Sequence, residues 1–137
     1  MIMKSLFSLA VAAALAAPLA FAGDIQTAPP TSFKKVSSLV QLPDYVPGLG
    51  TLYVDPATAP IGPYLGYDKS GKLASVTYMI PLKSLSERKA FDDLGQAVAG
   101  LKIDHTDVVF NPGHPGMMEP HYHVTQWLIP RSAEEKM

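Results

Sequence analysis

The amino-acid sequence predicts an α+β domain in which an antiparallel or mixed sheet of about five strands packs one helix on one face. Short segments with alternating or β-branched apolar residues recur at 51–54, 64–80, 102–110 and 121–129, which is typical of strands. Between the second and third of these, residues 85–99 carry apolar side chains at helical spacing. The chain has 137 residues, which is the length of one domain.

The two ends of the chain differ from the middle. Residues 1–22 have the pattern of a secretory signal, with Lys4, a short apolar run and an Ala-Phe-Ala cleavage site. Residues 23–35 are polar with a Pro-Pro pair and predict a flexible lead, residues 36–130 the single domain, and residues 131–137 a mobile tail. We therefore expect a periplasmic or secreted protein, with no stable membrane anchoring after cleavage.

Composition excludes several kinds of chemistry. The formal net charge is -1, and the arginines are Arg88 and Arg131, so nucleic acid is not an expected partner. The sequence has no cysteine, which excludes thiolate nucleophiles and cysteine-type zinc sites. Any metal must be bound through nitrogen, oxygen or thioether sulfur.

The first half of the domain contains a hairpin signal. Residues 64–80 form two apolar segments around Asp-Lys-Ser-Gly, in which Gly71 supplies the positive φ of a tight turn. Both faces of the second segment are apolar, which predicts a central strand. Residues 36–42 fit either a strand or a helical turn, and the Pro-rich residues 43–63 predict a surface loop around one short strand.

The helix prediction over residues 85–99 depends on a capping box and an apolar stripe. Ser84 and Glu87 have the spacing at which each side chain caps the other residue's amide. Apolar residues then recur at i, i+3, i+7 and i+10, namely Phe91, Leu94, Val98 and Leu101. Gly100 is placed to end the helix.

The four histidines of the chain lie close together in sequence, between residues 105 and 123. His121 and His123 are two apart on a predicted strand, so their imidazoles project from one face and can bind the same ion. His114 lies in the preceding Gly/Pro-rich loop, and His105 on the preceding strand is an optional fourth ligand. We expect Asp107 or Glu119 to orient an imidazole by accepting its second N-H.

These donors favour a zinc or copper ion as cofactor. In a carrier or sensor, protein donors would fill the site, whereas in an enzyme a water would hold one position and the metal would lower its pKa. Met117 and Met118 lie in the same loop; their thioethers suit Cu(I), but loop packing is the favoured interpretation. Trp127 shares the histidine face, as a pocket wall or as core.

Two alternatives remain. In the first, the chain is a structural or interaction protein, including a homo-oligomer, whose histidines only fix the Pro-rich loop to the sheet. In the second, His105 and Asp107 form a dyad of a metal-independent enzyme, although the sequence offers no Ser or Cys nucleophile motif.

The histidine segment resembles two families. The run Pro120, His121, His123 after Gly113 or Gly116 is similar to part of the cupin metal motif, but fourteen residues follow His123, which leaves no room for a second cupin motif. The segment resembles more closely the uncharacterised exported bacterial DUF5602/TTHB-type domain. The residues that match its pattern are Asn111, Pro112, Gly113, His114, Pro115, Pro120, His121, Tyr122 and Trp127.

The DUF5602/TTHB-type resemblance covers the last third to half of the chain and implies an α+β fold with no assigned activity. The chain departs from the family pattern at two positions. It has His123 where the pattern has Asp, and Thr125 where the pattern has a final His.

Overall fold

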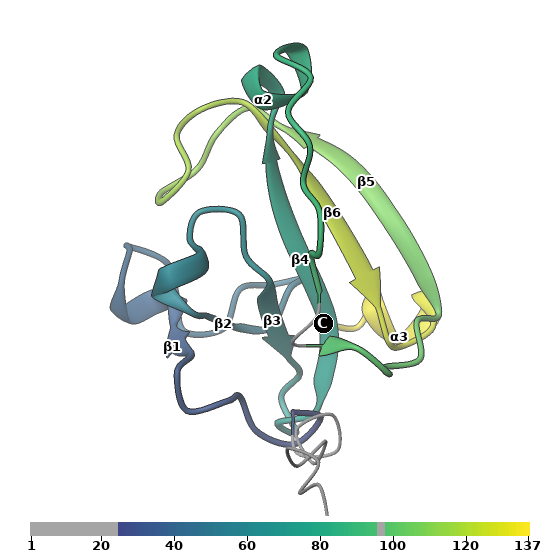
Figure 1. Ribbon diagram of the computed structural model, residues 1–137. Coiled ribbons are helices and arrows are strands. Elements are labelled where there is room, and N and C mark those ends of the chain that lie inside the picture. Colours follow the sequence, from purple (N-terminus) through teal and green to yellow (C-terminus); the bar gives the residue numbers. More distant parts are fainter. Residues whose placement is uncertain (1–24, 96–97) are drawn as a thin grey trace, which may run out of the picture.

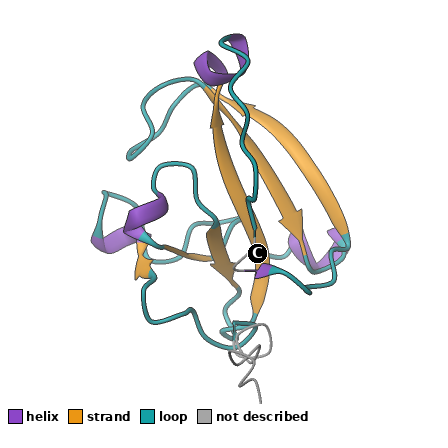
Figure 2. Ribbon diagram, in the orientation of Figure 1, coloured by secondary structure: helices purple, strands orange, loops and turns teal. Residues whose placement is uncertain are grey.

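The computed structural model describes residues 25–95 and 98–137, which form one six-stranded sheet (Figure 1). Its strands are β1 (Lys34–Lys35), β2 (Thr51–Val54), β3 (Tyr64–Tyr67), β4 (Leu73–Pro81), β5 (His105–Asn111) and β6 (His121–Trp127). Their order is β1-β2-β3-β4-β6-β5, and each neighbouring pair is antiparallel. The helical elements are short: η1 (Val36–Ser38), η2 (Pro56–Thr58), α2 (Leu82–Ser86) and α3 (Arg131–Glu134) (Figure 2). The α+β prediction therefore holds in outline, but the domain is richer in β-structure than expected.

One face of the sheet carries the hydrophobic core. Val76, Tyr78 and Ile80 alternate along β4 and are buried on this face. The rest of this core comes from β3, from the start of β4 and from segments outside the sheet, namely Ile25, Leu65, Tyr67, Leu73 and Val98. The chain after α2 returns along the sheet and contributes to this side (Figure 1).

The opposite face of the sheet carries the histidines. His121 and His123 on β6 pair with Pro81 and Met79 on β4, and Thr125 pairs with Thr77. Paired residues of an antiparallel sheet project to the same side. This histidine face is covered by residues 36–49, the cover segment, and by the loop that joins β5 to β6, because both line a cavity together with Thr77 and Met79.

The strand predictions are confirmed with small differences in their ends. β3 and β4 form the predicted hairpin, with Gly71 at φ 83° in its turn. β4 lies between β3 and β6, and all nine of its residues are buried, as expected of a central strand. β5 pairs with β6 along seven positions. Residues 36–38, for which the sequence left two alternatives, form the 3-10 helix η1.

The predicted helix over residues 85–99 is wrong. The helix α2 ends at Ser86, and the described residues 87–95 contain no helix. Arg88 and Asp93 have φ angles of 57° and 60°, whereas an α-helix needs φ near −63°. Glu87 is the C-cap of α2 rather than part of a capping box. Phe91, Val98 and Leu101 still pack on the core, whereas Leu94 is 40% exposed, so the apolar stripe marked burial at three of its four positions and not a helix.

Both ends of the domain make more contacts than their composition suggested. In the lead expected to be flexible, Ile25 is 1% exposed, and its carbonyl oxygen accepts a hydrogen bond of 2.6 Å from the Tyr67 hydroxyl. In the tail expected to be mobile, α3 is present, and the Met137 carbonyl oxygen accepts from the Gly48 amide at 2.9 Å. Motion in either segment stays a prediction.

The predicted signal sequence, residues 1–22, lies outside the described residues. Within the part of the chain that is described, every helix falls short of the length and apolar character needed to cross a membrane. Export therefore stays a prediction.

Candidate metal centre

The three histidines at 114, 121 and 123 bring their Nε2 atoms together at one point. The Nε2 atom of His121 lies 2.9 Å from that of His123 and 3.1 Å from that of His114. The Nε2 atoms of His114 and His123 are 3.1 Å apart. The predicted convergence of these imidazoles is therefore observed, and the described Asp and Glu side chains do not join the group.

The loop between β5 and β6 delivers His114 to the strand pair. Its tip is a reversal in which the backbone of His114 and that of Met117 exchange two hydrogen bonds of 2.9 Å. Asn111 holds the start of the loop by accepting from the Gly113 amide through Oδ1. Gly116, at φ 89°, lies so close to Val40 that a Cβ there would come within 3.1 Å of a Val40 methyl. The cover segment around Val40 thus helps to set the position of His114.

The two methionines of the loop have different environments. Met117 is 4% exposed and packs under the loop, whereas Met118 is 76% exposed. The packing interpretation fits Met117 only, and Met118 lies on the surface.

Backbone carbonyl groups fix the ring orientation of two of the histidines. His121 Nδ1 lies 2.7 Å from the Glu119 carbonyl oxygen, and His114 Nδ1 lies 2.9 Å from that of Pro115. Because a carbonyl oxygen only accepts, each Nδ1 carries the ring proton. In this tautomer a neutral ring has its lone pair on Nε2, and the Nε2 atoms of both residues face the point where the three residues meet.

His123 completes the group as a neutral imidazole. Burial, and then the neighbouring rings of His121 and His114, lower the pKa of His123 to about 4. Its Nε2 can carry one proton and donate to one neighbour. The Nε2 atoms of His114 and His121 lie 3.1 Å apart, and in neutral rings both are acceptors. No hydrogen would then lie between these two atoms.

The separations suit a bound cation. Two nitrogen ligands at ~2.05 Å from one ion lie about 2.9 Å apart at a right angle and about 3.3 Å apart at the tetrahedral angle. The observed separations of 2.9 to 3.1 Å fall in this range. An ion held by His114, His121 and His123 would accept all three lone pairs at once. Three imidazoles from the protein leave the remaining coordination positions open.

His105 does not join this group, contrary to its predicted role as an optional fourth ligand. It pairs across the sheet with Trp127, whereas His123 pairs with Val109. Four residues of strand separate the two positions, which is about 13 Å. Strand alternation correctly predicted that His105 lies on the histidine face. Only the pairing register shows how far His105 lies from His123 along the strands.

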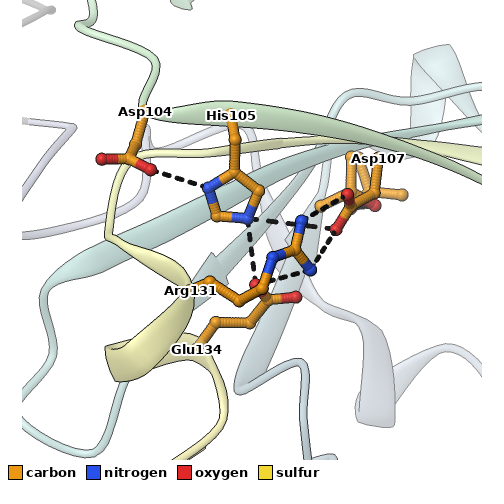
Figure 3. A network of polar contacts seen from close by, with 7 residues as sticks. Asp104, His105, Asp107, Arg131 and Glu134 are labelled. Atoms are coloured by element: carbon orange, nitrogen blue, oxygen red, sulfur yellow. Dashed lines mark hydrogen bonds and ion pairs between the residues drawn. The ribbon is translucent and has the colours of Figure 1, made fainter.

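His105 belongs instead to a network of charges at the other end of β5 (Figure 3). Its Nδ1 lies 2.8 Å from Asp104 Oδ1, and its Nε2 lies 3.0 Å from Glu134 Oε2. These hydrogen bonds raise the pKa of His105, that with Asp104 most strongly. Trp127 stacks on the His105 ring at a centroid distance of 6.2 Å and is 3% exposed, so it is core here.

The predicted roles of Asp107 and Glu119 also change. Asp107 accepts from Arg131 at 2.9 Å and 3.5 Å, and this guanidinium lowers the pKa of the Asp107 carboxyl. Its partner is thus a cation and not an imidazole of the three-histidine group. Glu119 does orient His121, but through its backbone carbonyl.

A second group that could hold an ion consists of His105, Asp107 and Glu134. Arg131 already occupies it, since the guanidinium lies 2.9 Å from Asp107 and 3.6 Å from Glu134. Sequence reasoning missed Glu134 because it treated the tail as mobile. The sequence feature that could have indicated Glu134 is the charged run after Pro130, which can form a short helix.

Fold and site together describe a β-rich α+β domain with a candidate three-histidine metal centre between a strand and a loop. No family model and no curated protein matches the chain. The crystal structure of the hypothetical protein TTHB210 from Thermus thermophilus is similar, with 45% sequence identity and a TM-score of 0.63. The match covers 69% of this chain and 91% of that one. The chain therefore belongs to the family of this uncharacterised protein, and the DUF5602 assignment stays a prediction.

Proposed function

We propose that this chain is an exported protein that binds one zinc or copper ion through His114, His121 and His123. The observation that carries the proposal is the convergence of three Nε2 atoms within 3.1 Å of one another, two of them in rings whose Nδ1 donates to a carbonyl oxygen. Neutral imidazoles in this arrangement lack a hydrogen for at least one contact, and a cation satisfies all three.

The proposed centre has three protein ligands and a free coordination position. Three protein ligands with a free position are typical of zinc ions that act on a bound water or substrate, whereas structural zinc ions have four protein ligands. A water in the free position would have a lowered pKa. A reaction at this centre would begin from that position.

Metal titration of the protein tests the proposal. We expect one Zn(II) or Cu(II) per chain with a Kd below about 10 μM, a binding free energy of about −7 kcal/mol or better. The double variant His121→Ala/His123→Ala should lose this binding, and the matched control His105→Ala should keep it, because His105 lies in the separate charge network. Equal metal uptake by the double variant and the control would overturn the assignment.

Export is a second part of the proposal and rests on residues 1–22. Their charged start, apolar run and small residues before Gly23 fit a cleaved signal. Expression of the full chain in a bacterial host should give a mature protein that starts at Gly23 outside the cytoplasm. Uncleaved protein retained in the cytoplasm would contradict it.

An interaction protein is the second candidate, and the edge of the sheet favours it. Among the described strands, β5 has no partner on its outer side. Val108, Val109 and Phe110 on this strand are 63%, 58% and 49% exposed. Exposed apolar edge strands pair readily with other chains. If copies of the chain associate there, Val108→Lys should reduce the mass measured by light scattering. An unchanged mass in the variant would exclude this edge as the interface.

A further inference from the structure

A cavity of about 290 Å³ lies on the histidine face, beside the three-histidine group. Two of the histidines, His114 and His123, form part of its wall. The cover segment of residues 36–49 and the strands β2 and β4 form most of the rest, through Val36, Leu39, Val40, Leu42, Val46, Leu49, Leu52, Val54 and Met79. The cavity therefore brings a set of aliphatic side chains to the same point as the candidate metal centre.

Each polar side chain of the wall, apart from the histidines, makes a hydrogen bond within the protein. Tyr64 donates its hydroxyl to the Pro60 carbonyl oxygen at 2.9 Å. Thr77 shares a hydrogen bond of 3.0 Å with Thr125. Asn111 accepts from the Gly113 amide through Oδ1. A molecule in this cavity would thus meet mainly apolar surface, and its polar anchor would be the metal centre.

Volume and access limit the size of the occupant. An apolar cavity of about 150 Å³ is enough to bind benzene, so a volume of 290 Å³ holds about 12 non-hydrogen atoms. Ala59 and Pro115 line the cavity and are exposed, so the cavity can be reached from solvent on that side. Small-molecule sites have this character, with mostly apolar walls and a few polar groups that fix orientation.

We propose that this cavity binds a small, mainly apolar molecule whose single nitrogen, oxygen or sulfur donor occupies the free position of the metal ion. The inference rests on the proposed metal centre, because the ion supplies the polar anchor. The apolar body of the ligand lies against Leu49, Leu52 and Val54, and the donor atom reaches the ion between His114 and His123.

Two probes that differ only in an apolar group test the proposal. The protein is loaded with Co(II), whose visible spectrum changes when a donor enters its coordination sphere, and is titrated with imidazole and with 4-phenylimidazole. The second probe has about 11 non-hydrogen atoms, which fits the cavity. Burial of its phenyl group should make it bind about 10- to 100-fold more tightly than imidazole.

Wall variants locate the phenyl group. Leu52→Phe and Leu49→Phe fill part of the cavity from two different segments, so one can be used if the other folds poorly. Each should remove most of the preference for 4-phenylimidazole without changing Co(II) affinity. Leu85→Phe is the matched control, because Leu85 is 46% exposed on α2 and lies outside the cavity wall. It should keep the preference.

The outcomes separate the two proposals. A protein that binds none of Co(II), Zn(II) and Cu(II) overturns the metal centre and the ligand proposal with it. If only Zn(II) or Cu(II) binds, the two probes are compared by calorimetry on the protein loaded with that ion. A protein that binds Co(II) but shows equal affinity for both probes, or keeps the preference in both wall variants, overturns the ligand proposal alone.

Discussion

Replacement of His123 by leucine distinguishes a metal centre from a structural histidine cluster. His123 is partly buried on the cavity wall, and burial with its two histidine neighbours lowers its pKa to about 4, so the ring is neutral at pH 7. Leucine has a similar size and suits the apolar wall. The two functions predict different stability changes for this variant when metal is absent.

The expected magnitudes follow from the contacts of His123. If the cluster binds metal, the metal-free rings hold opposed lone pairs, and His123→Leu should change the free energy of unfolding by less than about 0.5 kcal/mol. If the histidines only fix the loop, His123 Nε2 carries a proton, and the variant removes the one hydrogen bond that it donates, at 2.9 Å to His121 or at 3.1 Å to His114. Because His121 is 0% exposed, its unpaired Nε2 would then cost about 1 to 3 kcal/mol.

Zinc supplies the second half of the comparison. At 100 times Kd, one bound ion should stabilise the wild-type protein by about 2.7 kcal/mol. For a domain of this size that is roughly 10 °C in Tm. The His123→Leu variant should lose most of this increase, while His105→Leu keeps it.

Thermal unfolding followed by circular dichroism, in chelator and in zinc, measures both effects. A loss above about 1 kcal/mol for His123→Leu in chelator, together with no effect of zinc on the wild type, would refute the metal centre. The structural alternative would then account for the cluster.

Three further predictions concern the surroundings of the site. The raised pKa of His105 means that its ionised form stabilises the folded state. This contribution is complete below the usual pKa of 6.5 and is lost as pH rises through the raised value, so the Tm of wild type should exceed that of His105→Asn by less and less over that window. A difference in Tm that stays constant with pH would contradict this. Gly116→Ala and Gly100→Ala should each lower the free energy of unfolding by about 1 kcal/mol, because both glycines have positive φ. Only Gly116→Ala should also weaken zinc binding several-fold, because its new methyl group meets Val40. Equal zinc affinities of the two variants would mean that the contact with Val40 does not position His114. Ile25→Ala should lower the free energy of unfolding by about 2 to 5 kcal/mol, as expected for a core residue that is 1% exposed, whereas a change near zero in chemical denaturation would mean that the lead is not packed.

Local sequence patterns predicted the strands because the chemistry of strands is local. The turn residues 68–71 specify a hairpin by themselves, since Asp68 Oδ1 accepts from the amides of Ser70 and Lys72 while Gly71 takes the positive φ. The alternation of His121 and His123 likewise fixes their common face before any tertiary contact is known.

The helix prediction failed for a reason that local patterns do not contain. Apolar spacing from Phe91 to Leu101 indicates that one side of the segment is buried, and an irregular chain can satisfy that requirement as well as a helix. The left-handed backbone at Arg88 and Asp93 redirects the chain, and a side chain at Gly95 would come within 2.6 Å of the Tyr78 hydroxyl. This close approach to a core tyrosine is a tertiary constraint, and it overrides helical propensity.

The cover segment was underestimated for a similar reason. Its proline and glycine content predicted a surface loop, and a surface loop it is, but Val40, Val46 and Leu49 turn apolar side chains toward the histidine face. Composition alone does not show which face of the sheet a loop covers. The cavity exists only because this loop covers the face that carries His121 and His123.

The position of Thr125 bears on how the third histidine of the candidate metal centre is supplied. The family pattern suggested a histidine there, and a side chain at 125 does share the face of His123. In this chain, however, the Thr125 hydroxyl pairs with Thr77, and both residues are buried. A ligand on the strand would extend the site along β6 toward Trp127, whereas His114 enters from the loop and leaves the donors clustered at the start of the strand. The reversal from Gly113 to Met117 therefore decides the geometry of this centre, and the strand provides only two of its three nitrogens.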